Sequence, residues 1–354
     1  MTFKTRYFVI VSLLVMFVGL GTGLVAYYVG FPASAFFSTG APDELRYMPS
    51  TASVVGYVEV RELMASDLRQ RLRQTMGAQA QDDHKREFQE LTGINFETDI
   101  ERVIACFDGA DTSANASNSG LVFARGLFDD VKIEALMREH GARVEDYKGK
   151  HLILVDHFGG PGDFSNQFTP DSKPRGNPDF ALAFIEPGLV SFGSHALVQH
   201  AIDLHTSGGE SAATNDDIVS HVRALDGGTA WIVGRMDVLR ARAKIPDVVA
   251  NQLPPITWFS FRGRVDGGLQ ARLSADGRDD EAANMLRDVV RGFLALAKLQ
   301  TSSKPEFQHF VQSLQLSGTG KTVSLSLDVP SQVFDALGAM APKQSTQPKE
   351  QTPQ

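Results

Sequence analysis

The stretch SGTGKT at residues 317–322 has the residue types of a loop that binds nucleotide phosphates. Such a loop reads GxxxxGK[ST] and leads into a helix whose N-terminal amides hold the phosphates. Here Gln315 stands where the first glycine is required, and the residues after Lys321, TVSLSLDV, alternate between polar and apolar as a strand does. The sequence therefore predicts a hairpin turn at Thr319-Gly320-Lys321 and no nucleotide site.

Three histidines, His195, His200 and His205, fall within one expected helix, HALVQHAIDLHTS, for which Ser194 is the expected N-cap. Residues five apart are separated by about 140° around a helix. The three imidazoles therefore point in different directions, and we expect no shared metal site there.

The segment DHFGGPGDF offers the only other cluster of chemically active side chains, namely Asp156, His157 and Asp163. Two acids and a histidine around a Gly-Pro loop have the residue types of a divalent-cation site or of a hydrolase site. A flexible connection, or a mobile cover over the sheet, is the alternative interpretation of such a long irregular loop.

No recognised catalytic motif accompanies these candidates. The GxSxG, HExxH, GxGxxG, CxxC and EF-hand patterns do not occur. Cys106, the one cysteine, lies in the apolar run RVIACF, so the sequence predicts a buried small side chain and no disulfide. We therefore expect a protein that is not an enzyme and that has no cofactor.

The charge balance disfavours nucleic acid as a partner. The formal net charge is −8, whereas phosphate backbones are bound by clustered lysine and arginine. The densest basic run, Arg69, Arg71 and Arg73, is flanked by acids and is expected to be a solvated helix face.

Residues 7–29, YFVIVSLLVMFVGLGTGLVAYYV, carry no charge. As a helix this segment would rise about 35 Å, enough to cross a hydrocarbon core of about 30 Å. Lys4 and Arg6 precede it, and the first charges after it are Asp43 and Glu44. By the positive-inside rule we expect a single-pass signal anchor with a cytoplasmic N-terminus and a periplasmic or extracellular remainder. Cleavage after Ala35 is left open.

Small residues at Gly19, Gly23, Ala26 and Gly30 share one face of this expected membrane helix. Such a face permits close helix packing, so a homodimer is one partner that the sequence allows, besides the lipid bilayer.

The part outside the membrane is expected to contain an internal repeat. TASVVGYVEV, from Thr51, aligns without a gap with TAWIVGRMDV, from Thr229. Each copy continues with a helical segment, two strands, another helix and a hairpin; the first copy then adds the hairpin FALAFIEPGLVSFG and the helix at residues 195–207. The predicted organisation is a cytoplasmic stub (1–6), the anchor (7–29), a linker (30–42), module 1 (43–210), module 2 (211–341) and a disordered tail (342–354).

The fold class that follows is α+β, with helices packed on one face of antiparallel, hairpin-built sheets. Many of the 23 phenylalanines lie in the expected strands. Core packing explains them, and an apolar ligand cavity is the alternative.

Two stretches carry a resemblance to known proteins. ELRYMPSTASVVGYVEVREL, from Glu44, and FQELTGINFETDIERVIACF, which ends at Phe107, resemble the opening of uncharacterised bacterial envelope proteins with one N-terminal membrane helix. The resemblance implies an envelope location and no particular activity. We therefore expect a membrane-anchored binding or interaction protein, with a carrier of an apolar ligand or a hydrolase with an unrecognised site as alternatives.

Overall fold

The computed structural model describes residues 41–67, 69, 89, 93–95, 97–108, 120–139, 141–155, 180–242, 254–265, 267–301 and 311–330. Among the helices of these residues, none has both the length and the hydropathy of a membrane span. The apolar segment of residues 7–29 lies outside the described residues, as do most of the linker and the whole tail.

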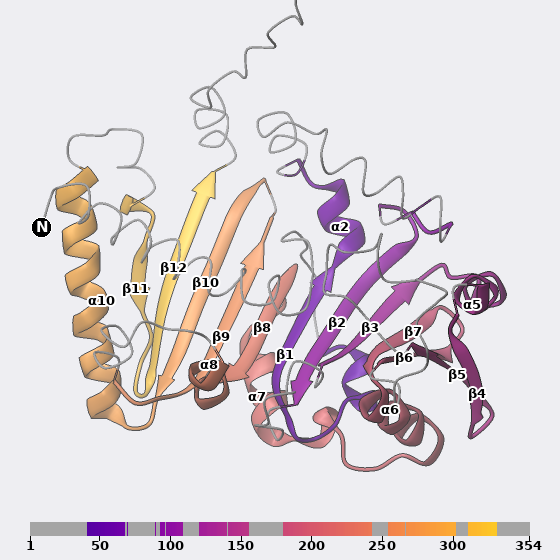
Figure 1. The fold of residues 1–354 in the computed structure, drawn as a ribbon. Helices are drawn as coiled ribbons and strands as arrows, with labels where there is room; N and C mark the ends of the chain where they lie inside the picture. Colours follow the sequence, from indigo (N-terminus) through magenta and orange to yellow (C-terminus); the bar gives the residue numbers. More distant parts are fainter. Residues whose placement is uncertain are drawn as a thin grey trace, which may run out of the picture.

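The described strands join in one antiparallel sheet of twelve, in the order β11-β12-β10-β9-β8-β1-β2-β3-β7-β6-β5-β4 (Figure 1). Each of these strands was predicted from period-two alternation or an apolar run between turn residues. They are β1 (Ala52–Glu59), β2 (Ile100–Asp108), β3 (Gly120–Gly126), β4 (Arg143–Tyr147), β5 (Lys150–Val155), β6 (Phe180–Glu186), β7 (Leu189–Ser194), β8 (Ala230–Arg235), β9 (Ile256–Arg264), β10 (Gly268–Gly277), β11 (Gln315–Ser317) and β12 (Thr322–Pro330).

Helices follow or connect these strands. They are the short 3-10 helices η1 (Asp43–Tyr47) and η3 (Ala212–Thr214) and the α-helices α2 (Val60–Ala65), α5 (Asp130–Glu139), α6 (His195–Ser207), α7 (Asp216–Ala224), α8 (Met236–Arg242) and α10 (Asp280–Thr301). Ser194 caps α6 as predicted, accepting a hydrogen bond from Leu197 N. No helix was expected at α7, although Asn215 accepts hydrogen bonds from the amides of Asp217 and Ile218 as an N-cap residue does.

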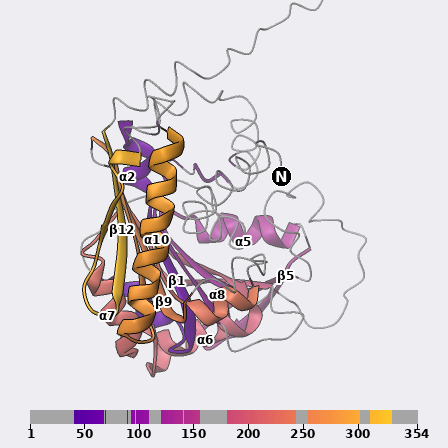
Figure 2. The same cartoon turned by 90° about the vertical axis from the view of Figure 1, so that its left-hand side faces the viewer.

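The sheet has helices on both of its faces, so the prediction of helices on one face was wrong. Successive residues of a strand point to opposite faces. In β8, Trp231 belongs to the same buried cluster as Ile218 of α7, whereas the next residue, Ile232, belongs to a cluster with Met236 of α8. Figure 2, viewed from the β11 end, shows α7 and α10 on either side of the strands.

We name the two faces by their longest helices. The α6 face carries η1, α6 and α7, and its buried cluster includes Tyr57, Phe123, Leu152, Ile202, Ile218 and Trp231. The α10 face carries α2, α8 and α10, whose side chains pack in three further clusters that include Val60, Met236 and Leu286. α5 also lies on this face. Its Glu134 contacts His151 of β5, and the next residue, Leu152, belongs to the buried cluster of the α6 face, so His151 points to the α10 face.

The hairpin turns have the backbone that their residue types predict. Lys148 and Gly149 both have positive φ, at 51° and 76°, as a two-residue turn between β4 and β5 requires. Gly320 has φ 55° in the turn between β11 and β12. SGTGKT is therefore the tip of a hairpin, as expected, and the strand β12 follows its lysine.

Candidate functional site

The residues that the sequence singled out fall into two groups. Gly19, Gly23, Ala26 and Gly30 of the expected membrane helix lie outside the described residues. The loop candidates Asp156, His157 and Asp163 do so as well. The predictions that rest on them stay predictions.

The three histidines of α6 diverge, as their spacing predicted. His205 lies 4.0 Å from Glu186 Oε1 and contacts the ring of Tyr47 edge-on. The Nε2 atom of His195 is buried and accepts or donates no hydrogen bond among the described residues. Within the described part of the chain, no three His, Cys, Asp or Glu side chains come together as metal ligands would.

Cys106 and the SGTGKT turn are both structural. The thiol of Cys106 is buried in β2, and burial raises its pKa, so it is not a reactive thiolate. At the turn, Arg287 of α10 donates from Nη2 to the carbonyl oxygens of Gly320, at 2.5 Å, and Thr322, at 3.0 Å. An arginine of the chain itself thus fixes the hairpin tip.

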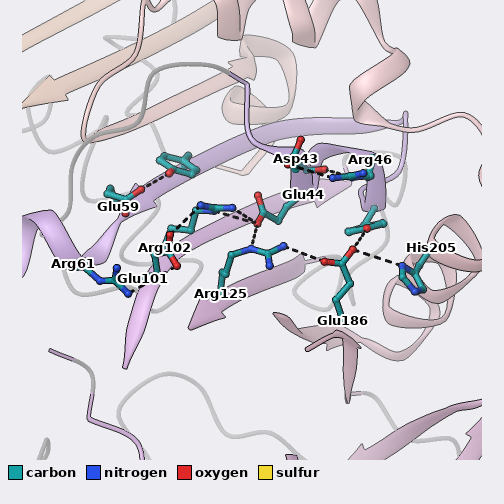
Figure 3. Close-up of polar contacts among 12 residues, drawn as sticks. Asp43, Glu44, Arg46, Glu59, Arg61, Glu101, Arg102, Arg125, Glu186 and His205 are labelled. Carbon is teal, nitrogen blue, oxygen red and sulfur yellow. Dashed lines mark hydrogen bonds and ion pairs between the residues drawn. The ribbon is translucent and has the colours of Figure 1, made fainter. Parts of the chain in front are cut away.

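A buried acid–arginine cluster forms where η1 meets β2 and β3 (Figure 3). Arg125 donates from Nε to Glu44 Oε1 at 2.7 Å, and Arg102 donates from Nε and Nη2 to the same oxygen at 3.2 and 3.1 Å. The Glu44 side chain is 1% exposed. Arg102 and Arg125 are directly opposite each other in β2 and β3, so the carboxylate of Glu44 lies between two like charges, and Glu101 and Glu186 form a further ion pair with Arg102 and Arg125 respectively.

The same cluster extends to β6 through Glu186. This carboxylate accepts hydrogen bonds from Arg125 Nη2 and from the hydroxyl of Tyr47. Burial and that hydrogen bond raise the pKa of Tyr47 to about 12. Burial alone would raise the pKa of Glu44, but the hydrogen bond from Arg125 and the charges of both arginines lower it below its usual range. The cluster is therefore an ionised tie that fastens η1 to the sheet.

A second polar cluster joins α7 to β10. His221 Nε2 lies 2.9 Å from Asp276 Oδ2, and Thr322 donates to Asp276 Oδ1 at 2.7 Å. The imidazole also stacks on Trp258, with ring centroids 4.4 Å apart. This is the geometry of a His–Asp dyad, which the sequence did not indicate because its members lie 55 residues apart.

Both ring nitrogens of His221 are occupied, however. Nδ1 lies 2.7 Å from the carbonyl oxygen of Asp217, an acceptor, so this nitrogen donates. Nε2 faces a carboxylate and donates as well, which makes the ring an imidazolium. The hydrogen bond to Asp276 is the main cause that raises the pKa of His221, and the same bond lowers that of Asp276. With no nitrogen left to accept a proton, His221 ties α7 to the sheet and is no general base.

The third feature is a polar surface on the α6 face of β9, β10 and β12. Register places these side chains on that face, because Ser260 and Arg262 are opposite Val233 and Trp231 of the buried cluster. Among the described helices, α8 and α10 pack on the other face of these strands, and α7 borders this surface on the α6 face. Its His221 stacks on Trp258 of β9 and contacts Asp276 of β10. We call this surface the open patch: Ser260, Arg262, Gln270, Arg272, Ser274, Ser324, Ser326 and Asp328.

Two arginines dominate the open patch, and register places Arg264 of β9 on the same face, opposite Gln270. Arg262 and Arg272 are directly opposite each other in β9 and β10. Neither forms an ion pair with a carboxylate of the described residues, although the sheet holds such pairs elsewhere. Burial, together with the charges of Arg272 and Arg264, lowers the pKa of Arg262. The alternation in ITWFSFRGR and GLQARLSADG did place these arginines on one strand face, but the sequence did not show that the two strands would align them.

No family model and no curated protein matches the chain. A solved structure described as "Structure of crystal form I of TP0453" is similar to it with a TM-score of 0.41 and 9% sequence identity. The match covers 84% of this chain and 97% of the other.

Proposed function

We propose that the protein is a membrane-anchored, extracytoplasmic binding protein without catalytic activity, which presents the open patch to its ligand. One observation carries this proposal: the α6 face is buried under η1, α6 and α7 over most of the sheet, whereas on β9, β10 and β12, beyond the contacts that α7 makes with Trp258, Asp276 and Arg262, the described residues leave a polar strand surface. Polar strand residues that no described helix covers are available to a partner.

The proposed duplication explains why the two ends differ. The sheet order runs β8-β9-β10-β12-β11 in one direction from its centre and β1-β2-β3-β5-β4 in the other, with β7 and β6 inserted between β3 and β5. The aligned positions Val55 and Val233 pair with each other, as a two-fold relation between two modules requires. Both members of the helix pairs α2/α8 and α5/α10 lie on the α10 face, so the helices of the α6 face are those that the proposed repeat lacks.

The chemistry of the two polar clusters supports a binding role over an enzymatic one. In the first, Glu44 is held by two arginines and its side chain is 1% exposed, so no substrate reaches its second oxygen; in the second, both nitrogens of His221 donate. A hydrolase would need a base with a free lone pair near its substrate. The hydrolase alternative therefore depends on Asp156, His157 and Asp163.

The proposed location rests on the sequence. The uncharged segment of residues 7–29, the preceding Lys4 and Arg6, and the resemblance to bacterial envelope proteins support a single-pass anchor with the sheet outside the cytoplasm. Pairing through Gly19 and Gly23 would make the anchored protein a homodimer.

A carrier of an apolar ligand is the second candidate. Phe184 and Phe192 pack in one cluster of the α10 face and Phe259 and Phe261 in another, so these rings share a face of the sheet. Only Phe123, of the strand phenylalanines in the buried clusters, lies on the α6 face. An apolar ligand would therefore bind on the face opposite the open patch.

Native mass spectrometry of the full chain in a mild non-ionic detergent tests the proposal. We expect a bound species that Ser326→Trp, which fills the open patch, removes. Glu145→Trp is the matched control, because Glu145 is an exposed strand residue on the same face at the far end of the sheet. A bare protein, or a bound species that Ser326→Trp leaves in place, would contradict the proposal.

The same spectra separate the alternatives. A lipid-sized mass that survives Ser326→Trp supports the apolar carrier. A dimer that Gly23→Ile abolishes supports pairing through the membrane helix, since a branched side chain there would hold the helices apart.

A further inference from the structure

We propose that Arg272 and Arg262 form a binding site for a phosphoryl group within the open patch. The inference rests on the proposed binding function and names the chemistry of its ligand.

The guanidinium of Arg272 is positioned for an external anion. Its Nε donates to the hydroxyl oxygen of Ser326 at 3.2 Å, which orients the planar group. Its two Nη atoms have no hydrogen-bond partner among the described residues, and the side chain is exposed. A guanidinium with both Nη atoms available is the donor pair that binds two oxygens of a phosphate or carboxylate at once.

Arg262 is held in place from its other side. Its Nη1 donates to the carbonyl oxygens of Leu225, at 2.6 Å, and Asp226, at 3.2 Å, at the C-terminal end of α7. This contact satisfies carbonyl groups that the helix end leaves unpaired. Nη2 has no hydrogen-bond partner within the described residues. Arg262 therefore contributes a positive charge at a fixed position, and its Nη2 can donate to an anion beside Arg272.

The chain itself shows what an arginine pair of this kind binds. In β2 and β3, Arg102 and Arg125 are a cross-strand pair on the same α6 face, and Glu44 Oε1 accepts hydrogen bonds from both. Directly opposed like charges destabilise a sheet unless an anion lies between them. No described carboxylate forms an ion pair with either arginine of β9 and β10, although the charge of Asp226 acts on Arg262, so an external anion is the group that would complete the pair.

Three features favour a phosphoryl group over a carboxylate. Two guanidinium groups match the charge of about −2 that a phosphate monoester carries at neutral pH. Serine hydroxyls flank the pair: Ser326 beside Arg272, and Ser274 two residues along β10, whose hydroxyl lies 2.8 Å from that of the buried Ser324. A tetrahedral phosphate has a third and a fourth oxygen for such donors, whereas a planar carboxylate has only two oxygens. A phosphorylated soluble ligand and a phospholipid headgroup would both supply this group.

Binding of inorganic phosphate to the full chain in non-ionic detergent, followed by line broadening in phosphorus NMR, tests the site. We expect saturable binding that Arg272→Gln weakens about tenfold or more, because charge-assisted hydrogen bonds are about twice as strong as neutral ones. Arg291→Gln is the matched control, because Arg291 is exposed on α10 and paired with Asp288. We expect it to bind phosphate as the wild type does, and acetate to compete poorly.

The melting temperature of Arg272→Gln keeps this test interpretable. We expect it to equal or exceed that of the wild type, because the substitution removes one of two opposed like charges. No saturable phosphate binding, or equal binding by wild type and Arg272→Gln, would overturn the site.

Two further comparisons distinguish the sources of the phosphoryl group. They also separate a failure of the phosphoryl site from a failure of the proposed binding function. Displacement of the bound phosphate by a short-chain phosphatidic acid in the same detergent, but not by a short-chain phosphatidylcholine, would assign the site to a lipid headgroup; phosphate binding that the short-chain phosphatidic acid does not displace would assign it to a soluble ligand. If phosphate does not bind but Ser326→Trp still removes a bound species, the phosphoryl site is wrong and the binding function stands. If neither effect appears, both are wrong.

Discussion

The two ends of the α6 face carry the same feature in different surroundings. At each end, two arginines are directly opposite each other in neighbouring strands, Arg102 with Arg125 and Arg262 with Arg272. The first pair lies beneath η1 and shares the buried Glu44, and each of its arginines has one further carboxylate partner. The second pair lies on a polar surface that α7 borders at Arg262, and neither of its arginines forms an ion pair with a described carboxylate. At one end, an acid of the chain itself, Glu44, stabilises the arginine pair. At the other end, we propose that the anion comes from a bound ligand.

The largest effect that we predict comes from removing the covered pair's counter-ion. Glu44→Gln would leave two partly buried arginines without their shared carboxylate. Losing one partner of a buried ion pair typically costs about 3–5 kcal/mol. We expect a loss of free energy of unfolding of about 3 kcal/mol in urea denaturation, because the arginines are 24% and 22% exposed and retain some solvent.

Asp43→Asn is the control for this variant. Asp43 lies beside Glu44 in η1, but its ion pair with Arg46 is exposed, with side chains 74% and 53% accessible. Exposed pairs contribute about 0–1 kcal/mol, so we expect no more than that. Equal losses for the two variants would show that Glu44 is not the tie that holds η1 on the sheet.

A smaller effect, and a pH-dependent one, is expected where α7 borders the open patch. The pKa of His221 is raised above its usual 6.5 and that of Asp276 is lowered below 3.8, each chiefly by their mutual hydrogen bond. The stabilisation by His221 is complete below pH 6.5 and is lost as pH rises through its folded-state pKa. The stabilisation by Asp276 is complete above about pH 4 and is lost as pH falls through its own lowered pKa.

The variant His221→Gln tests this linkage. We expect a loss of about 1.5 kcal/mol of unfolding free energy at pH 6, the lower end of the contribution of a hydrogen bond to a charged group, because the two side chains are partly exposed. The loss should shrink as the pH is raised toward 9, because the wild type then loses the imidazolium too. His151→Gln, at an imidazole 58% exposed, should cost less than about 0.5 kcal/mol. A cost for His221→Gln that is independent of pH would contradict the assignment of a charged His221.

The strands were predictable because their signal is local. Alternation in QSLQLSGTGKTVSLSLDV and the turn residues of ARVEDYKGKHLILVD suffice to place β11, β12, β4 and β5. The pairing of β1 with β8, which joins all the described strands in one sheet, depends on contacts between residues far apart in the chain. No local pattern encodes such a contact.

The polar clusters were missed for the same reason. Glu44 and Arg125 are 81 residues apart, and Glu44 was read only as a charge that follows the apolar segment. α6 was predicted as a helix, but no local pattern indicated that it packs on the face opposite α2, α5, α8 and α10, and α7 was not recognised. Its N-cap, Asn215 followed by Asp216 and Asp217, was the available signal.

Arginine-directed labelling tests the contrast between the two pairs most directly. The full chain, in non-ionic detergent, would be treated with phenylglyoxal and the modified peptides quantified by mass spectrometry. We predict that Arg272 is labelled faster than Arg102 and Arg125, and that inorganic phosphate slows labelling at Arg272 alone among the three. Equal rates at the three arginines, or labelling of Arg272 that phosphate leaves unchanged, would contradict an open, anion-binding patch on β9, β10 and β12.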